Sequence, residues 1–472
     1  MTPQPTPPTT VDDVYARRSF YRWLALVAAL LAWTFDGVEQ GVYMLRTREA
    51  LKELIPSVSE EVRRLNEINE VIQAKAGTGA PVSAEKEESQ RLSREIDTEL
   101  SEYFGLAFAM WLWGAAAGGI VFGRMGDRYG RVRSLMFAVV TYSVFTGVSA
   151  FSQHWTHLAA CRFLGALGLG GAWPLSVAIL VETWPDKHRS VLAGLMGAGA
   201  NVGFFIAAMY SGIMWSHGYN WRWVFGMGFF IGASSLALIS FVPETTKWKI
   251  ARQQARPSSF KDVFTRRYRR STIVGSLLST VALLGTWGSF LWLATYVAQI
   301  TEGTEDEGSA LNIVSRWQSY GQIVGGFLGG LLARWMGNKT SWCFLCVSAW
   351  ATVFALFGLN DQYGLRMVWM AAFAGLFVTA FFGWLPKFLP ELYPTRIRAT
   401  GQGFSFNIGR ILTGAGVLGA GALVNVFGGN YQKGMMIIAS IYLVGLAIIW
   451  FAPETGGKMV SDDEESAGGT AR

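Results

Sequence analysis

The sequence is poor in charge, in cysteine and in histidine. Only 15% of its 472 residues are charged, against roughly 25% in an ordinary soluble domain, and 51% are hydrophobic. Its three cysteines lie in apolar surroundings and its four histidines are scattered, so neither a disulfide framework nor a set of metal ligands is present. P-loop and nucleophile-elbow motifs are also missing. We therefore expect no enzymatic activity, no metal and no cofactor.

Long apolar runs take up much of the chain instead. A membrane-spanning helix needs about 20 mostly apolar residues, and twelve such runs follow one another along the sequence. We predict an all-α membrane protein with twelve transmembrane helices. The predicted spans are residues 20–44, 103–122, 135–153, 157–181, 190–214, 223–242, 272–299, 311–333, 341–358, 364–389, 399–427 and 433–452.

The basic residues predict how these spans are oriented. Lys and Arg in short loops stay on the cytoplasmic side, and they are concentrated after the second span and in the connection at residues 243–271. The loop from Glu302 to Glu307, after the seventh span, is acidic instead. Both terminal tails, residues 1–19 and 453–472, are therefore predicted to lie in the cytoplasm beneath the cytoplasmic membrane. Topology then accounts for most of the net charge of +7, and no nucleic-acid partner is expected.

One charged segment separates the first two spans. Residues 46–102 contain 9 Lys/Arg and 13 Asp/Glu, a net charge of −4. Apolar residues at helical spacing occur on both sides of a break at residues 76–81. We predict an extracytoplasmic helical hairpin here. Two roles are open: a solvated spacer, or a lid or partner-docking element over the outer mouth.

Three short motifs occur twice in the chain. Their offsets are 209, 210 and 207 residues, and such near-equal spacing at equivalent loops indicates an internal duplication. We predict two six-helix halves, residues 20–242 and 272–452, with the substrate path between them. The repeated motifs are Glu182-x-x-Pro185-x-x-x-Arg189 with Glu391-x-x-Pro394-x-x-x-Arg398, Pro243-Glu244-Thr245 with Pro453-Glu454-Thr455, and Gly123-x-x-x-Asp127-x-x-Gly130 with Gly330-x-x-x-Arg334-x-x-Gly337.

Several of these motifs resemble those of the major facilitator superfamily. Gly123 to Arg131, read as Gly-Arg-Met-Gly-Asp-Arg-Tyr-Gly-Arg, is similar to that family's signature between helices 2 and 3. Within the family, Asp36-Gly37-Val38-Glu39 resembles aromatic-acid/proton symporters, Asn407-x-Gly409-Arg410 resembles these and the sialic-acid branch, and the Pro-Glu-Thr segments resemble sugar porters. The resemblance implies secondary transport by alternating access. It also implies the lipid bilayer and a small-molecule substrate as partners.

Ionisable residues deep in a predicted span are the first candidates for transport chemistry. Asp36 is about 20 Å along its helix from Trp23, and Glu39 follows on the same face. Two carboxylates so close do not both ionise easily, which suits reversible proton binding, although Glu39 has an alternative place at the outer interface. Arg410, about 18 Å beyond Arg398, is the deepest cation. It either pairs with an acid such as Asp36 or binds an anionic substrate.

Polar and aromatic residues of other spans complete the predicted site. Gln322, Gln402, Asn407 and Trp173 are candidates for substrate binding, although most tryptophans in such a chain serve packing. The family resemblance assigns a further set of charges to the closing of one access state, with a purely structural role equally open for Arg162. That set consists of Asp127, Arg128, Arg131, Arg162, Glu182, Arg189, Glu391 and Arg398.

We therefore predict a monomeric, proton-coupled symporter of a small organic anion, such as an aromatic acid, a sugar acid or a similar carboxylate. A facilitator or symporter of neutral sugars or polyols is the first alternative, supported by the Pro-Glu-Thr segments. A transporter-like nutrient sensor, whose hairpin or basic connection binds a partner protein, is the second.

Overall fold

The computed structural model describes residues 19–76, 82–254, 258–290, 292–301, 304–306, 309–426 and 431–460. Most of the predicted terminal tails, most of the break at 76–81, and Glu302 and Glu307 of the predicted acidic loop lie outside these ranges. Within them the fold is helical, without a β-strand. The α-helices are α2 Ser19–Leu54, α3 Pro56–Ala76, α4 Ser83–Tyr129, α5 Arg131–Ser149, α6 Trp155–Thr183, α7 Arg189–Ser216, α8 Trp221–Ser240, α9 Thr246–Gln254, α10 Arg269–Phe290, α11 Leu293–Thr301, α12 Ala310–Met336, α13 Asn338–Gly358, α14 Leu365–Phe388, α15 Arg398–Val426, α16 Tyr431–Ala439 and α17 Ile441–Ile448.

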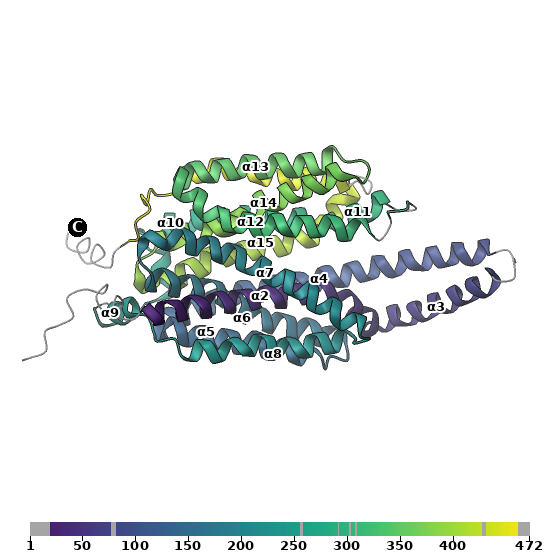
Figure 1. The fold of residues 1–472 in the computed structure, drawn as a ribbon, viewed down its shortest axis with the longest axis horizontal. Coiled ribbons are helices and arrows are strands. Elements are labelled where there is room, and N and C mark those ends of the chain that lie inside the picture. The colour runs from purple at the N-terminus through teal and green to yellow at the C-terminus, as the bar shows by residue number, and fades with distance from the viewer. Residues whose placement is uncertain are drawn as a thin grey trace, which may run out of the picture.

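Short 3-10 helices connect some of these elements. They are η1 Asp186–His188, η2 Phe260–Phe264, η3 Leu389–Leu392, η4 Thr395–Ile397 and η5 Ile449–Phe451. The long helices lie side by side along the longest axis of the molecule (Figure 1). The helix pair α3 and α4 projects beyond the bundle at one end, and α9 lies at the other. We refer to these as the α3 end and the α9 end.

The two halves of the chain pack their helices in the same way. A methyl group added at Gly118 of α4 would lie 1.9 Å from the Leu167 carbonyl of α6, and one added at Gly325 of α12 would lie 1.9 Å from the Leu376 carbonyl of α14. Glycine therefore permits both close approaches, as is usual between membrane helices. The turns repeat as well, because Gly130 and Gly337 have φ angles of 114° and 79° between equivalent helices, a region that glycine adopts without strain.

Nine helical stretches of the described chain are long and apolar enough to cross a membrane. The helices α2, α12 and α15, which the sequence also predicts as spans, are not among the nine. They carry polar side chains in their middle, such as Asp36, Gln322 and Arg410, which lower their mean hydropathy. The prediction of an all-helical membrane fold is confirmed, whereas the number twelve stays a prediction.

The projection at the α3 end is formed by α3 and by residues 83–102 of α4, which we call the arm. Ser57 Oγ donates to Glu99 Oε1 at 2.7 Å, and Arg64 pairs with Glu88. At the base of the arm Leu51, Leu54, Val58, Leu92, Ile96 and Leu100 belong to one buried cluster. Because α4 is continuous from Ser83 to Tyr129, the α4 part of the arm and the helix within the bundle are one uninterrupted helix.

Candidate functional site

Asp36 lies in the middle of α2 and is fully buried. Gln40, one turn further along the helix, donates from Nε2 to Asp36 Oδ1 at 2.9 Å. The second carboxylate oxygen, Oδ2, has no hydrogen-bond partner among the described residues. A buried carboxylate oxygen without a donor is costly, so this atom is a candidate for binding a proton or a cationic group.

Arg410 of α15 faces Asp36 from the other half of the chain. Its guanidinium lies over the Phe406 ring at 5.4 Å and is 4% exposed. Its Nε and Nη1 atoms have no hydrogen-bond partner within the described part of the chain. Asp36 is within electrostatic range, but the two side chains form no ion pair. The structure thus brings the predicted acid near the predicted cation and leaves unused hydrogen-bonding atoms on both side chains.

Three other predicted residues lie at the contact between α6 and α15. Asn407 Nδ2 donates to the Gly170 carbonyl at 3.1 Å, and Gln402 Nε2 donates to the Pro174 carbonyl at 2.5 Å. The side-chain oxygens of both amides are buried without partners. Trp173 stacks on Phe406 with ring centroids 4.0 Å apart, and the Arg410 guanidinium contacts the same Phe406 ring. Phe406 was not singled out from the sequence, because one aromatic residue among many carries no signal of its own.

Gln322 of α12 is placed differently. Its carbonyl accepts hydrogen bonds from Asn201 Nδ2 at 3.4 Å and from Thr379 Oγ1 at 2.9 Å. No hydrogen bond of its half-buried side chain connects it with Asp36 or Arg410 in the described structure. Gln322 therefore connects α12 with α7 and α14 through its backbone carbonyl.

Glu39 pairs with Arg162 rather than reaching the outer interface. The two side chains are both buried and form an ion pair. Thr146 Oγ1 donates to Glu39 Oε1 at 3.0 Å, and Arg162 Nη2 donates to Ser149 Oγ at 2.7 Å. The Arg162 guanidinium also lies over the Phe225 ring at 4.6 Å. Arg162, grouped by resemblance with the gating charges, thus lies beside the candidate proton site, in a polar cluster of its own.

Most of the predicted gating charges meet at the α9 end in two clusters. In the first, Arg131 pairs with Asp127 at 2.8 Å and with Glu182 at 3.0 Å, and all three are buried. Asp127 also accepts the Thr400 backbone N–H at 2.7 Å, at the start of α15. Arg398 of the second half lies 3.3 Å from Glu182. This cluster therefore joins the two halves.

The second cluster is centred on Glu391. Arg189 of the first half lies 3.3 Å from this carboxylate, Asn338 Nδ2 donates to it at 2.9 Å, and Lys387 Nζ lies at 3.5 Å. Lys387 and Asn338 were missed from the sequence, since neither belongs to a repeated motif. Arg128 joins neither cluster: its exposed side chain lies over the Tyr129 ring at 5.2 Å.

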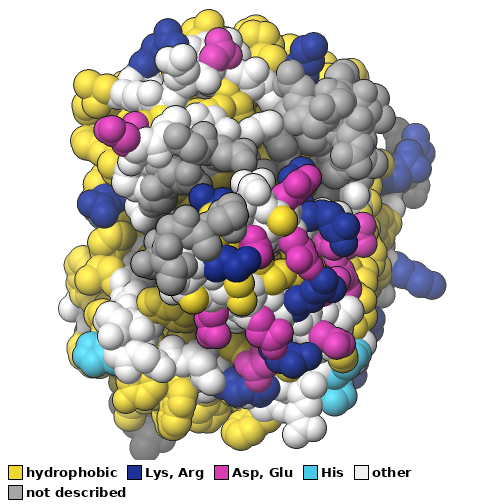
Figure 2. Space-filling view, turned by 90° about the vertical axis from the view of Figure 1, so that its right-hand side faces the viewer, with side chains coloured by type: hydrophobic (Ala, Val, Ile, Leu, Met, Phe, Trp, Pro, Cys, Tyr) yellow, Lys and Arg dark blue, Asp and Glu magenta, His cyan; other side chains and the backbone are white. Residues whose placement is uncertain are grey.

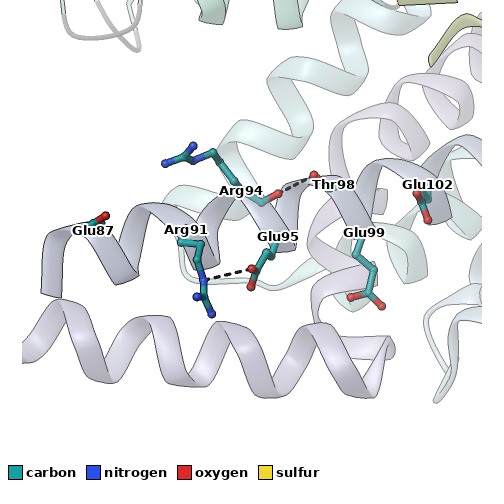
Figure 3. A pocket seen from close by; sticks show the side chains of 7 residues that line it. All are labelled: Glu87, Arg91, Arg94, Glu95, Thr98, Glu99 and Glu102. Carbon is teal, nitrogen blue, oxygen red and sulfur yellow. Dashed lines mark hydrogen bonds and ion pairs between the residues drawn. The ribbon is translucent and has the colours of Figure 1, made fainter. Parts of the chain in front are cut away.

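The surface of the arm carries charges of both signs (Figure 2). A shallow groove runs along its α4 face, where Arg91 pairs with Glu95 at 3.3 Å and Arg91 and Glu99 point toward α3 (Figure 3). Its charges are partly compensated within the arm, so the groove by itself indicates no ligand. The residues that line it are Glu87, Arg91, Arg94, Glu95, Thr98, Glu99 and Glu102.

Comparisons with known proteins identify the family. The sequence model of the Major Facilitator Superfamily matches residues 92–417. A putative metabolite transport protein of Haemophilus influenzae is 31% identical over 77% of this chain and 90% of its own length. The sialic acid transporter NanX of Escherichia coli is 28% identical over 72% of this chain and 82% of its own.

Solved structures agree on the fold. The proton:xylose symporter XylE superposes with a TM-score of 0.69 at 18% sequence identity, over 93% of this chain and 98% of that one. Together with the apolar helices, these likenesses identify an integral multi-pass membrane protein that transports a small molecule and is not an enzyme. The chain belongs to the major facilitator superfamily.

Proposed function

We propose that this transporter is a proton-coupled symporter of a small organic anion. The arrangement of Asp36 and Arg410 carries the proposal. This carboxylate and this guanidinium come from opposite halves, both are buried, they lie within electrostatic range, and each has hydrogen-bonding atoms without a partner in the described structure. A guanidinium in a low-dielectric site binds a carboxylate strongly. A carboxylate substrate on Arg410 would withdraw that cation from Asp36, and Asp36 would then take up a proton. The relative that transports sialic acid supports an acidic substrate.

The proposed topology has twelve spans in two six-helix halves, with the α9 end and both termini in the cytoplasm and the arm outside. The concentration of basic residues in the connection at 243–271 supports this orientation. The two clusters at the α9 end then hold the cytoplasmic side closed, and they must separate when the substrate is released inward. We propose that the protein works as a monomer in the cytoplasmic membrane.

The proposal assigns different roles to the two acids of α2. Asp36 Oδ2 is free to bind a proton, whereas Glu39 is held by Arg162 and Thr146. Asp36 is therefore the proton carrier. The pair of Glu39 and Arg162 fixes α2 against α6 beside it and offers a second place for a proton when that pair opens.

The test uses purified protein in liposomes with a pH gradient and three labelled probes: benzoate, sialic acid and xylose. We expect uptake of an acid and no uptake of xylose. Asp36→Asn should abolish uptake driven by the pH gradient but allow exchange between equal concentrations of substrate. Arg410→Lys should raise the KM for the acid at least tenfold, because an ammonium lacks the planar fork.

Two outcomes would contradict the proposal. Uptake of xylose that is insensitive to a protonophore would identify a neutral-sugar facilitator. Full gradient-driven uptake by Asp36→Asn would remove Asp36 from the proton pathway. Lys52→Gln, at an exposed position near the end of α2, serves as the matched control for the change of one charge.

A further inference from the structure

Three exposed arginines lie where the chain enters α10. Arg266 lies in the turn before α10, and Arg269 and Arg270 are the first two residues of this helix; all three are exposed and together form one short basic face. None of the three forms an ion pair with any residue that the structure describes. Arg270 Nε donates to the Phe451 carbonyl at 2.9 Å, which fixes this face beside η5.

Several arginines at the α3 end are neutralised by acids. At the α3 end Arg222 pairs with Glu53 at 2.8 Å and Arg91 with Glu95 at 3.3 Å. Near α10 the acid closest in sequence, Asp262, is buried and already pairs with Arg396. The first turn of α10 contains no acidic residue that could balance the arginines. The positive charge at this site is therefore not compensated within the described fold.

Exposed aromatic side chains flank the same arginines. Phe264, Trp450 and Phe451 are 39%, 64% and 65% exposed. Aromatic residues at the ends of membrane helices sit at the level of the lipid headgroups, and α10 opens a stretch that is long and apolar enough to cross a membrane. The unpaired arginines thus lie where the helix would pass from headgroups into the hydrocarbon region.

We propose that this face, formed by Phe264, Arg266, Arg269, Arg270 and Phe451 and called here the basic α10 surface, binds the phosphate headgroup of an anionic phospholipid. Guanidinium groups hold phosphate oxygens with paired, charge-assisted hydrogen bonds. The two phenylalanines provide an apolar contact for the start of the acyl chains. The proposal requires only that the α9 end lie at a membrane surface, which is true for either orientation, and it goes beyond the transport function.

Another occupant has complementary charge, and the test must separate it from lipid. The C-terminal sequence contains Asp462-Asp463-Glu464-Glu465, beyond the described residues. We favour lipid because of the exposed aromatic residues, which an acidic peptide would not need.

The experiment compares binding of phosphatidylglycerol and phosphatidylcholine to the purified full chain by native mass spectrometry. The variant Arg266→Gln/Arg269→Gln leaves the bond of Arg270 intact and should fold normally. Its affinity for phosphatidylglycerol should fall about tenfold or more, with no change for phosphatidylcholine. The matched control, Arg63→Gln/Arg94→Gln, removes two exposed charges from the arm and should bind like the wild type.

Equal phosphatidylglycerol binding by the wild type and by Arg266→Gln/Arg269→Gln would overturn the proposal. It would also be overturned if phosphatidylglycerol bound only after removal of residues 461–472, since the acidic tail would then be the occupant. Both readouts are independent of transport. The lipid proposal and the symport proposal can therefore fail separately.

Discussion

Glu182 and Glu391, separated by 209 residues, share two equivalent contacts in the structure. Thr245 Oγ1 donates to Glu182 at 2.6 Å, and Thr455 Oγ1 donates to Glu391 at 2.6 Å. Each carboxylate also lies 3.3 Å from an arginine of the opposite half. The threonine of each Pro-Glu-Thr segment therefore donates to one of the two clusters that join the halves. The sequence alone did not predict this contact.

Because these two contacts are equivalent, they should contribute equally to closure of the α9 end. Double-mutant cycles with Arg398→Gln and Glu182→Gln, and with Arg189→Gln and Glu391→Gln, should give coupling free energies that agree within about 1 kcal/mol. Each single variant should destabilise the protein by roughly 1.5–3 kcal/mol, since it removes one charge-assisted contact from a buried cluster whose other partners remain. Chemical unfolding in detergent measures both quantities. A coupling free energy near zero for only one of the two pairs would contradict this prediction, because the two contacts would then have the same geometry but different strengths.

Gly119 should be intolerant of even a methyl group. A Cβ at this position would lie 2.0 Å from Asn407 Nδ2, which holds the Gly170 carbonyl. We expect Gly119→Ala to destabilise the protein by roughly 1–3 kcal/mol and to raise the KM for substrate, because Asn407 lies one turn before Arg410. Gly212→Ala is the control, since nothing lies within 4 Å of a Cβ there. Unchanged transport by Gly119→Ala would argue against Asn407 in the site.

The pair of Glu39 and Arg162 should behave as a stability element that can be removed as a whole. Either single variant, Glu39→Gln or Arg162→Gln, should lower stability by about 3 kcal/mol, and the double variant should recover part of the loss. The double variant should also retain uptake driven by the pH gradient, unlike Asp36→Asn. Thermal unfolding and the liposome assay measure the two effects. Loss of gradient-driven uptake in the double variant would make Glu39 a proton carrier too.

The tip of the arm should be dispensable, and its base should not be. Replacing residues 66–87 with two glycines keeps Leu92, Ile96 and Leu100 in the buried cluster at the base. We expect uptake within about twofold of the wild type and little change in Tm. Deletion of residues 57–100 exposes Leu51 and Leu54 and should lower Tm by several degrees. If shortening the tip alone abolished uptake, the arm would act as a lid over the outer mouth and not as a solvated spacer.

Stability should depend on pH through Lys247 of α9. Burial and the nearby Arg398 lower the pKa of this lysine from its ordinary value of 10.5. The folded state therefore disfavours the charged form, and this penalty is present at neutral pH and disappears as the pH rises toward 10.5. Lys247→Met should be more stable than the wild type at pH 7, and the difference should narrow at pH 9.5. A difference that widens with pH would contradict the sign of the shift. Lys249→Met, at an exposed neighbouring position, is the control.

The sequence by itself determined the helical membrane fold, since a low charge fraction and long apolar runs leave no other way to bury so much apolar surface. It also predicted an internal duplication, because three loop motifs recur at nearly equal offsets. Asp36, Glu39 and Arg410 were found by the same reasoning, as charges in places where charge is costly.

Only the tertiary structure decided which charges meet. Helical spacing fixes the face on which Glu39 lies but not its neighbour, and the neighbour proved to be Arg162, 123 residues away. In the same way Asp36 faces Arg410 across the two halves. Arg128 is exposed, although Asp127 and Arg131 of the same motif are buried. Partners far apart in sequence are set by the packing of whole helices, a property that no local pattern encodes.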